Sequence, residues 1–317
     1  MKRKILVTGS IAYDVLLGYD GSFADAIDPK ALDSLSLSFF SPHYAKHHGG
    51  TGANIAWNLH LLGESPLLVS SVGKDGREYT AILEERGIAV DRIEVLADHV
   101  TATAIVGTDS EERQITFFHP GADEYGTWPD LSQDRDDLAY AIVSPRDTTA
   151  MVKGMEWCKK FVVPVMFDPG QQIIAFGEDA LERMVRMGSA LIVNAYEWDL
   201  VQKKLSCDKK SILELVPLVI VTLGDQGFEV LDENGVQKMD ACTPLQVVNP
   251  TGAGDAFRAG LLKGFAAGWE VMDACKLGAA MGSLAVEHEG TLMDDLDMEE
   301  VKVRVKVAYG EELPKVE

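Results

Sequence analysis

Short runs of apolar residues alternate with longer amphipathic segments along most of the chain. The apolar runs begin at residues 4, 66, 140, 163, 190 and 218 and read KILVTG, PLLVSSVG, YAIVS, VPVMFDP, ALIVNA and LVIVTLG. Their length and their Gly, Pro, Ser or Asp borders predict buried strands, and the segments 147–161, 178–187 and 196–205 have helical spacing. This alternation predicts an α/β fold with a mainly parallel sheet covered by helices on both faces. Ligands of such sheets bind beyond the carboxyl ends of the strands. We therefore expect four parts of the chain near one edge: Thr8 to Asp14, Asp168, Asn194, and Thr222 to Gly227.

Two segments interrupt the alternation. Residues 15–46 contain no long helical pattern, and the stretch TATAIVGTDSEERQITFFHPGAD reads as two strands joined by a polar turn, Asp109 to Glu112. We expect segments of about 15–46 and 98–122 to form a small β-sheet lid, inserted into one domain that spans residues 1–317. A simple edge hairpin is the alternative that the periodicity alone also permits. We expect His47 and His48 in a solvated loop or in a hinge of the lid.

The composition limits the classes of partner. Asp plus Glu number 50 against 29 Lys plus Arg, so the net charge is −21. Such a charge argues against a nucleic-acid or anionic-membrane partner, because basic residues dominate binding to both. A phosphate ligand is still compatible, because backbone N–H groups can make a pocket locally positive.

The cysteines and the apolar runs indicate where the protein acts. The four cysteines form no C-x-x-C pair, which favours free thiols in a reducing compartment. The apolar stretch Ile5 to Val7 is too short for a signal peptide, and no run of about 18 apolar residues predicts a membrane span. We therefore expect a cytoplasmic monomer or homodimer that acts on small molecules.

The stretch NPTGAGDAFRAG, residues 249–260, places small residues at the start of a helical pattern. Gly252, Ala253 and Gly254 leave the backbone bare where the first N–H groups of a helix lack internal partners. Such a helix start favours an anion, most naturally a phosphate. Asp255 would be unfavourable beside an anion unless it accepts a proton from an attacking hydroxyl. Taken alone, the pattern also fits an ordinary helix start with Asp255 as a cap or dipole partner.

A second glycine-rich stretch, HHGGTGANIAWNLHLLGESPLLVSSVG, covers residues 47–73. The two stretches lie about 200 residues apart in the same order as the two signature patterns of the ribokinase-like, or phosphofructokinase B (PfkB), sugar and nucleoside kinases. The chain resembles this family over nearly its whole length. The resemblance implies a three-layer α/β/α fold with a small β-sheet lid, and it makes Asp255 the general base. The motifs TGSIAYD, SLSLSFF, DPGQQ and NAYEWDL are similar to the bacterial adenosine kinases.

The resemblance implies a role for each matching position. Asp255 would be the base, with Gly252, Ala253 and Gly254 as the anion hole. Substrate-binding residues would be Ser10, Asp14, Gly50, Asn54, Gln171 and Gln172, with either Phe117 or Phe118 against the base of a nucleoside. ATP would contact Asn194, Thr222, Gly224, Gly227, Gly252 and Gly254. Asn194 and Glu197, the N-x-x-E motif, would hold Mg²⁺ through water; without the resemblance, the pair would be interpreted as a helix cap followed by a surface glutamate.

The function implied is ATP-dependent phosphorylation of the 5′-hydroxyl of adenosine, which gives AMP. Alternatives are a sugar kinase of the same family, acting on ribose, fructose or a related sugar, and a nucleoside-binding protein without turnover. Many relatives have Asp where this chain has Asn249, a position that helps to frame a monovalent-cation loop in some members. The sequence therefore does not predict potassium activation.

Overall fold

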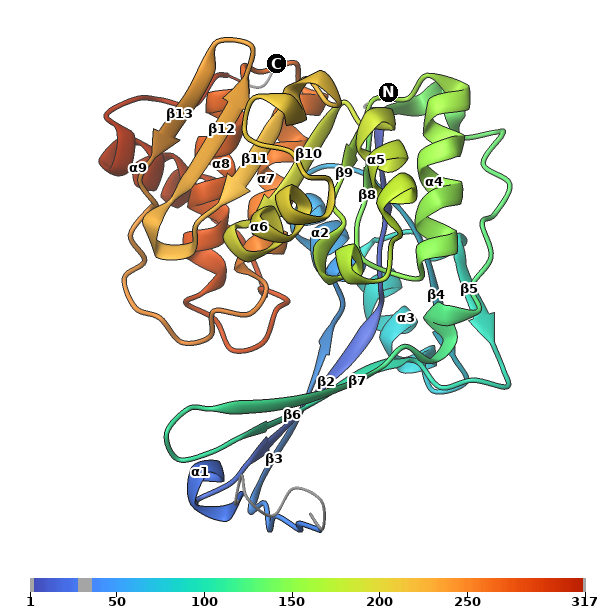
Figure 1. The fold of residues 1–317 in the computed structure, drawn as a ribbon, viewed down its shortest axis with the longest axis vertical. Helices are drawn as coiled ribbons and strands as arrows, with labels where there is room; N and C mark the ends of the chain where they lie inside the picture. Colours follow the sequence, from blue (N-terminus) through green and yellow to red (C-terminus); the bar gives the residue numbers. More distant parts are fainter. Residues whose placement is uncertain (1–2, 28–35, 316–317) are drawn as a thin grey trace.

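The computed structural model describes residues 3–27 and 36–315, and its largest feature is a mixed β-sheet (Figure 1). The strand order within this described part is β13-β12-β11-β10-β9-β8-β1-β4-β5. All neighbours from β11 to β5 pair in parallel, and β12 and β13 add an antiparallel edge. The strands are Lys4–Thr8 (β1), Pro66–Gly73 (β4), Ile93–Leu96 (β5), Leu138–Val143 (β8), Val165–Phe167 (β9), Ala190–Asn194 (β10), Val219–Thr222 (β11), Phe228–Asp232 (β12) and Gly235–Met239 (β13).

Helices cover both faces of this sheet and create two separate cores. The first core joins alternate strand residues to helices α2, α3, α7, α8 and α9, and the second joins the intervening strand residues to α4, α5 and α6. The three-layer α/β/α prediction is confirmed. These helices are Thr51–Leu61 (α2), Arg77–Arg86 (α3), Thr148–Phe161 (α4), Glu178–Met187 (α5), Ala195–Lys204 (α6), Ala253–Ala266 (α7), Val271–Ala285 (α8) and Met298–Tyr309 (α9).

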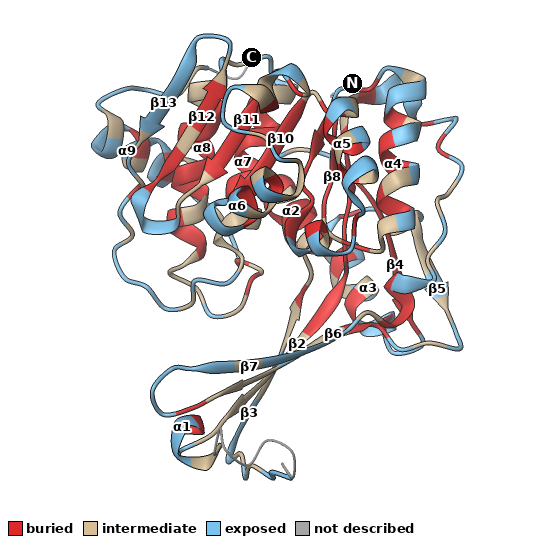
Figure 2. Cartoon of the chain, viewed as in Figure 1, coloured by how far each residue is buried: buried red, intermediate tan, exposed pale blue. Residues whose placement is uncertain are grey.

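A small four-stranded sheet projects from the main domain (Figure 1). Its order is β3-β2-β6-β7, and its strands are Ala12–Gly18 (β2), His43–Gly49 (β3), Ala102–Thr108 (β6) and Gln114–His119 (β7). A short helix, Phe23–Ala26 (α1), follows β2. Figure 2 shows that these strands are mostly half-buried or exposed, whereas most strands of the main sheet, apart from its edge strands β5 and β13, are buried. Part of the lid segment expected at 15–46, residues 28–35, lies outside the described residues.

Two expectations near this sheet need correction. The sequence placed Asp14 just beyond the first strand of the main sheet, but Asp14 lies inside β2, a strand of the small sheet. His47 and His48, expected in a loop or hinge, lie in β3 and pair with β2. The cause is that the chain leaves the main sheet after β1 and at once begins a new strand, which the apolar pattern does not distinguish.

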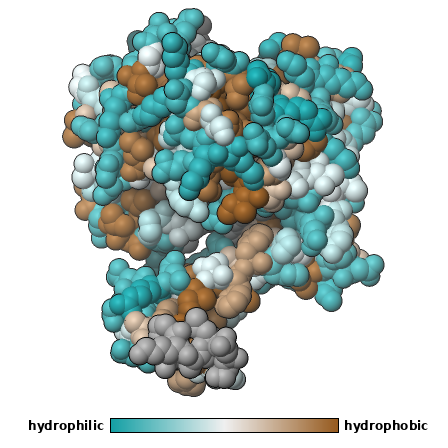
Figure 3. Space-filling view, in the orientation of Figure 1, coloured by the Kyte–Doolittle hydropathy of each residue, from teal (hydrophilic) through white to brown (hydrophobic). Residues whose placement is uncertain are grey.

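The surface is largely hydrophilic and the cysteines are unpaired, as the composition of the chain predicts. Hydrophilic residues cover much of the main domain in the view of Figure 3, with scattered apolar side chains between them. All four cysteines are free. None of the described helices is long and apolar enough to cross a membrane. The large side chains of Trp57, Trp198 and Met281 are buried in the core.

Glycine at the start of α2 brings that helix against β1. A Cβ atom built on Gly52 would lie 2.6 Å from the carbonyl carbon and oxygen of Gly9, just beyond β1. The amides of Gly52 and Ala53 both donate to the carbonyl of Ser10, so this contact also fixes the first turn of α2. The close approach determines where Asn54, one turn into the helix, is held.

We predict that Gly52→Ala destabilises the protein, because the added methyl group meets backbone atoms that cannot rotate away. The expected loss is about 1–3 kcal/mol in the free energy of unfolding, the usual range for overpacking. Gly177→Ala is the matched control, since a Cβ there meets nothing within 4 Å, and it should stay within about 0.5 kcal/mol. Equal urea midpoints for the two variants would contradict this account.

Candidate active site

The carboxyl ends of the parallel strands define the edge where the candidate residues gather. In an open α/β sheet, ligands bind beyond these ends. Ser10 and Asp168 follow β1 and β9, and Asn194 and Thr222 are the last residues of β10 and β11. The glycine-rich starts of α2 and α7 also meet at this edge, where Asn54 contacts Asp255.

Asp255 lies in the first turn of α7, whose amino terminus is uncapped by any side chain. Gly252 has φ of 88°, a left-handed conformation that favours glycine, and the helix starts at Ala253. The Asp255 carboxylate accepts a hydrogen bond of 2.8 Å from Nδ2 of Asn54. It is therefore turned toward α2, which does not fit the alternative of a simple helix cap.

The charge of Asp255 is costly in this environment. Burial raises the pKa of Asp255 to about 6, while Arg258 and the Asn54 hydrogen bond act in the opposite direction. Asp168 and Asp14 add to the rise through their negative charges. A carboxylate with a pKa near 6 is ionised at neutral pH and accepts a proton readily, as a general base requires.

Arg258 and Asp168 form a buried ion pair beside Asp255. Arg258 Nε and Nη2 donate to the two carboxylate oxygens of Asp168 at 2.6 and 2.7 Å, and Nη1 donates to the carbonyl of Gly254 at 3.0 Å. Ser144 Oγ donates to the same carboxylate at 2.9 Å. The guanidinium thus lies among the carboxylates of the site and holds the first turn of α7.

Arg258 was not among the site residues predicted from the sequence. The signal was present, since Arg258 interrupts the apolar run DAFRAGLL, and a charged residue on a buried helix face requires a partner. Asp168 was expected at the same edge, but no pattern linked it to residue 258. Only the fold brings these residues together across 90 positions.

Asn194 and Glu197 form a capping box at the start of α6. Asn194 Oδ1 accepts from the amide of Glu197, and Glu197 Oε2 accepts from the amide of Asn194, both at 2.8 Å. Taken alone, the pair was expected to be a helix cap followed by a surface glutamate; the cap is present, but Glu197 is only 6% exposed. Burial and the negative charge of Asp168 raise the pKa of Glu197.

A hydrated Mg²⁺ fits this donor set better than a directly held metal does. The described residues include no group of three or more His, Cys, Asp or Glu side chains able to hold a metal ion. Asn194 and Glu197 offer amide and carboxylate oxygens, and Mg²⁺ commonly combines one or two such ligands with waters and phosphate oxygens.

The register of the small sheet separates the two phenylalanines of β7. Asp14 pairs with His47 of β3 and with Ala104 of β6, and Ala104 pairs with Phe118. Paired residues point to the same side of a sheet, so these four residues share one face, which we call the Asp14 face. Phe117 lies on the opposite face. The sequence left this choice open.

Most other substrate-binding candidates also have structural tasks. Ser10 Oγ accepts from the amide of Thr51 at 3.2 Å, which supports the start of α2. Gly50 has φ of 94°, and a Cβ there would lie 2.5 Å from the amide nitrogen of Ala12. Gln171 is exposed and Gln172 half-buried, in a single 3₁₀ turn beyond Asp168.

The three nucleotide-binding candidates near β11 differ in surroundings. Thr222 ends β11, and its hydroxyl lies 3.5 Å from the carbonyl of Val193. Gly227 has φ of 89°, and any Cβ would collide with the Met239 carbonyl, so the turn into β12 requires glycine. Gly224, with φ of 62°, faces open space and leaves room for a ligand.

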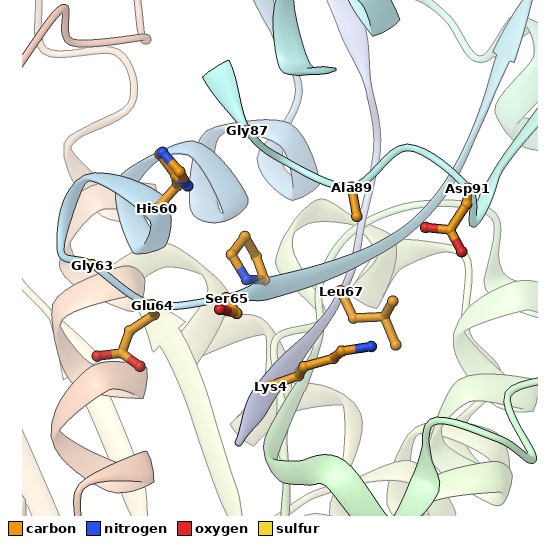
Figure 4. Close-up of a pocket in the computed structure, with 10 residues that line it drawn as sticks. Lys4, His60, Gly63, Glu64, Ser65, Leu67, Gly87, Ala89 and Asp91 are labelled. Atoms are coloured by element: carbon orange, nitrogen blue, oxygen red, sulfur yellow. The ribbon is translucent and has the colours of Figure 1, made fainter. Parts of the chain in front are cut away.

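A cavity of about 380 Å³ lies far from these residues (Figure 4). Lys4, Ser65 and Leu67 line it at the amino ends of β1 and β4, together with His60 at the end of α2. The opposite ends of these strands lead to the candidate site, so this cavity has no part in it.

We predict that breaking the Arg258–Asp168 pair is costly. Arg258→Met leaves a buried carboxylate without its counterion, and we expect a loss of about 3–5 kcal/mol in the free energy of unfolding. The double variant Arg258→Met/Asp168→Asn should lose much less than the two single changes added together. As a control, Arg186→Met removes an exposed pair with Glu182 and should cost less than about 1 kcal/mol. Similar losses for Arg186→Met and Arg258→Met would refute a structural role for the buried pair.

Comparisons with known proteins agree with this arrangement. Residues 3–297 match the model of the pfkB family carbohydrate kinases. A nucleoside kinase of Methanothermobacter thermautotrophicus is 32% identical over 316 residues, 98% of both chains. A nucleoside kinase of Burkholderia thailandensis, solved with inosine, superposes with a TM-score of 0.85 at 32% identity, covering 97% of this chain and 99% of that one. An ATP-dependent 6-phosphofructokinase of Thermoanaerobacterium thermosaccharolyticum is 28% identical over 82% of this chain and 85% of its own.

The family match covers residues 3–297, and the first of these relatives aligns over 98% of both chains. The fold, with its parallel sheet and small projecting sheet, is that of the same kinases. This protein belongs to the pfkB family of carbohydrate kinases, the ribokinase-like kinases.

Proposed function

We propose that this protein is an ATP-dependent nucleoside kinase that phosphorylates the 5′-hydroxyl of adenosine and releases AMP and ADP. The observation that carries the proposal is the half-buried carboxylate of Asp255 at the bare amino terminus of α7, held by Asn54. A base beside an anion-binding helix start suits proton removal from an alcohol next to a phosphate. The product would return a purine to the nucleotide pool.

The reaction that we propose needs no covalent intermediate with the protein. Asp255 accepts the 5′-hydroxyl proton as that oxygen forms its bond to the γ-phosphorus. The bond from this phosphorus to the β-bridging oxygen breaks, and ADP leaves. The N–H groups of Gly252 and Gly254 stabilise the charge spread over the transferring group, and that of Ala253, which donates to the carbonyl of Pro250 at 3.4 Å, would have to turn from it to join them. Positioning and electrostatics thus supply most of the catalysis.

Asn194 and Glu197 would hold the Mg²⁺ that accompanies ATP, through water molecules. When bound, the ion would neutralise phosphate charge. This matters in a site that already contains Asp168 and Asp255, because those carboxylates repel a triphosphate. Thr222 and Gly224, at the end of β11 and in the turn after it, are the positions that we propose for contacts with ATP.

The Asp14 face of the small sheet supports a nucleoside over a sugar phosphate. Asp14 would accept hydrogen bonds from two ribose hydroxyls, and Phe118 on the same face offers an aromatic surface for a base. No Lys or Arg belongs to this face among the described residues of the four strands; Lys46 pairs with Val15 on the opposite face. A phosphorylated sugar would find neither Lys nor Arg for its phosphate on this face, only imidazole side chains such as that of His47.

A binding protein without turnover is the remaining alternative. Such a protein would gain nothing from a carboxylate beside the phosphate, since its charge weakens ATP binding. The raised pKa of Asp255 also means that its ionised form destabilises the folded protein at neutral pH, which brings no benefit unless a proton is transferred. These two features favour an enzyme.

The acceptor is tested by measuring ATP consumption with adenosine, inosine, ribose and fructose 6-phosphate. We expect the highest kcat/KM with adenosine and at least about tenfold less with ribose, because ribose lacks the base that stacks on an aromatic side chain. A higher kcat/KM with inosine than with adenosine would mean that inosine is the preferred acceptor, and the protein would still be a nucleoside kinase. Ribose equal to adenosine would end the nucleoside proposal, and no turnover with any acceptor would favour the binding protein.

We predict that Asp255→Asn lowers kcat by roughly 10²-fold or more, the usual scale for loss of a positioned base. ATP affinity should stay the same or improve slightly, because a charge that repels the phosphate is removed. Near-normal turnover in a folded variant would show that Asp255 is not the base.

The same variant should be more stable than the wild type at pH 7. The pKa of Asp255 is about 6 in the folded protein against about 3.9 in an unfolded chain. The free energy of unfolding therefore falls as the pH rises from about 4 to about 6, and the loss is complete above pH 6. Asparagine removes this penalty. The difference in Tm should shrink as the pH falls from about 6 to 4 and should vanish below about pH 4, where the wild-type carboxyl is protonated in both states. An Asp255→Asn variant that melts below the wild type at pH 7 would contradict the assignment of that pKa.

A further inference from the structure

The hydroxyl of Thr291 connects three parts of the candidate site. Thr291 lies between α8 and α9 and is only 5% exposed. Its Oγ1 lies 2.8 Å from Oδ1 of Asn54 and 2.9 Å from the carbonyl oxygen of His48 in β3. A Cβ built on Gly252 would lie 3.1 Å from the Cβ of Thr291, so Thr291 also packs against the start of α7.

Asn54 transmits this contact to Asp255. Its amide is 3% exposed and has one acceptor oxygen and one NH₂ donor. The Thr291 hydroxyl has one proton, which lies between two acceptors, Oδ1 of Asn54 and the carbonyl oxygen of His48. Its contact with Oδ1 leaves Nδ2 of Asn54 to donate to Asp255 Oδ2 at 2.8 Å. If the amide were flipped, its oxygen would face the carboxylate of Asp255, and two acceptors would repel each other. The Thr291 hydroxyl supports the orientation that directs the donor toward the base.

We propose that Thr291 is a positioning residue of this kinase, which acts through Asn54 to orient the Asp255 carboxylate. The inference rests on the proposed function, in which Asp255 accepts the proton. Two side chains separate the hydroxyl from the transferring proton, so Thr291 itself touches neither substrate nor phosphate.

Loss of the Thr291 hydroxyl would also change the charge state of the base. The charged groups that act on Asp255 are Arg258 of the same helix, Asp168 after β9 and Asp14 in β2. Arg258 and the Asn54 donor lower the pKa of Asp255, whereas burial and the two carboxylates raise it. Without the donor from Asn54, the pKa of Asp255 rises further. The carboxyl then stays protonated up to a higher pH, where it cannot act as a base.

Two substitutions separate the hydroxyl of Thr291 from its packing. Thr291→Val keeps both branches of the side chain and removes the hydroxyl, whereas Thr291→Ser keeps the hydroxyl and removes the methyl group. We expect Thr291→Val to lower kcat roughly tenfold, the scale of one hydrogen bond. The KM for ATP should stay within about twofold of the wild-type value. The acid limb of the plot of kcat against pH should move to higher pH. Thr291→Ser should restore both kcat and the acid limb.

Two outcomes would overturn the proposal. One is a Thr291→Val variant with wild-type kcat and an unmoved acid limb; the other is equal impairment in the Val and Ser variants, which would assign the effect to packing. If Thr291→Val does not fold, Thr291→Ala compared with Thr291→Ser isolates the same hydroxyl, because both lack the methyl group. Equal kcat values and pH profiles in that second pair would also reject the proposal.

A measurement that does not depend on catalysis tests the role of Thr291 independently of the proposed function. The pH titration of the Asp255 carboxyl carbon, followed by NMR in labelled protein, should move to higher pH in Thr291→Val and return in Thr291→Ser. A wild type that phosphorylates no acceptor would end the proposed function while this titration still reports the Thr291–Asn54–Asp255 contacts. An unchanged titration in Thr291→Val would overturn the inference even in an active kinase.

Discussion

The contact between Arg258 and Asp168 is the interaction on which the site depends. Asp14, Asp168, Glu197 and Asp255 are held near one another, and a cluster of negative charges opposes its own burial. The guanidinium satisfies both oxygens of Asp168 and also binds the first turn of α7 through the carbonyl of Gly254. One side chain therefore offsets charge and fixes the helix that carries the proposed base. Replacing either partner would leave an uncompensated charge beside that base.

The two glycine-rich helix starts depend on each other in a comparable way. Gly52 allows α2 to approach the backbone after β1, and Gly252 gives α7 its left-handed entry. The approach of both helices brings Asn54 to Asp255, across 201 positions of the chain. A helix start alone would attract any small anion. The amide and carboxylate added to it make a site suited to moving a proton next to a phosphate.

Several residues that resemblance would assign to ligands also have architectural tasks. Asn194 and Glu197 cap α6, Ser10 supports α2, and Gly227 is required by the turn into β12. The two kinds of role are compatible, because a side chain fixed by a cap is already oriented when a ligand arrives. A loss of activity on substitution would therefore need a stability measurement beside it before a ligand contact is inferred.

The sequence by itself determined the layered fold and the positions of the main strands and helices, because buried strands and amphipathic helices have periodic patterns that are local. It also determined that Asp255 follows a bare helix start, since the glycines and the carboxylate are neighbours in the chain. The tertiary structure alone decided that Asp14 lies within the small sheet, that Phe118 shares its face, and that Arg258 and Thr291 reach Asp168 and Asn54. These facts depend on strand register and on contacts between residues far apart in the chain. No local sequence pattern encodes such contacts, because each of them forms only when the whole sheet and its helices have packed together.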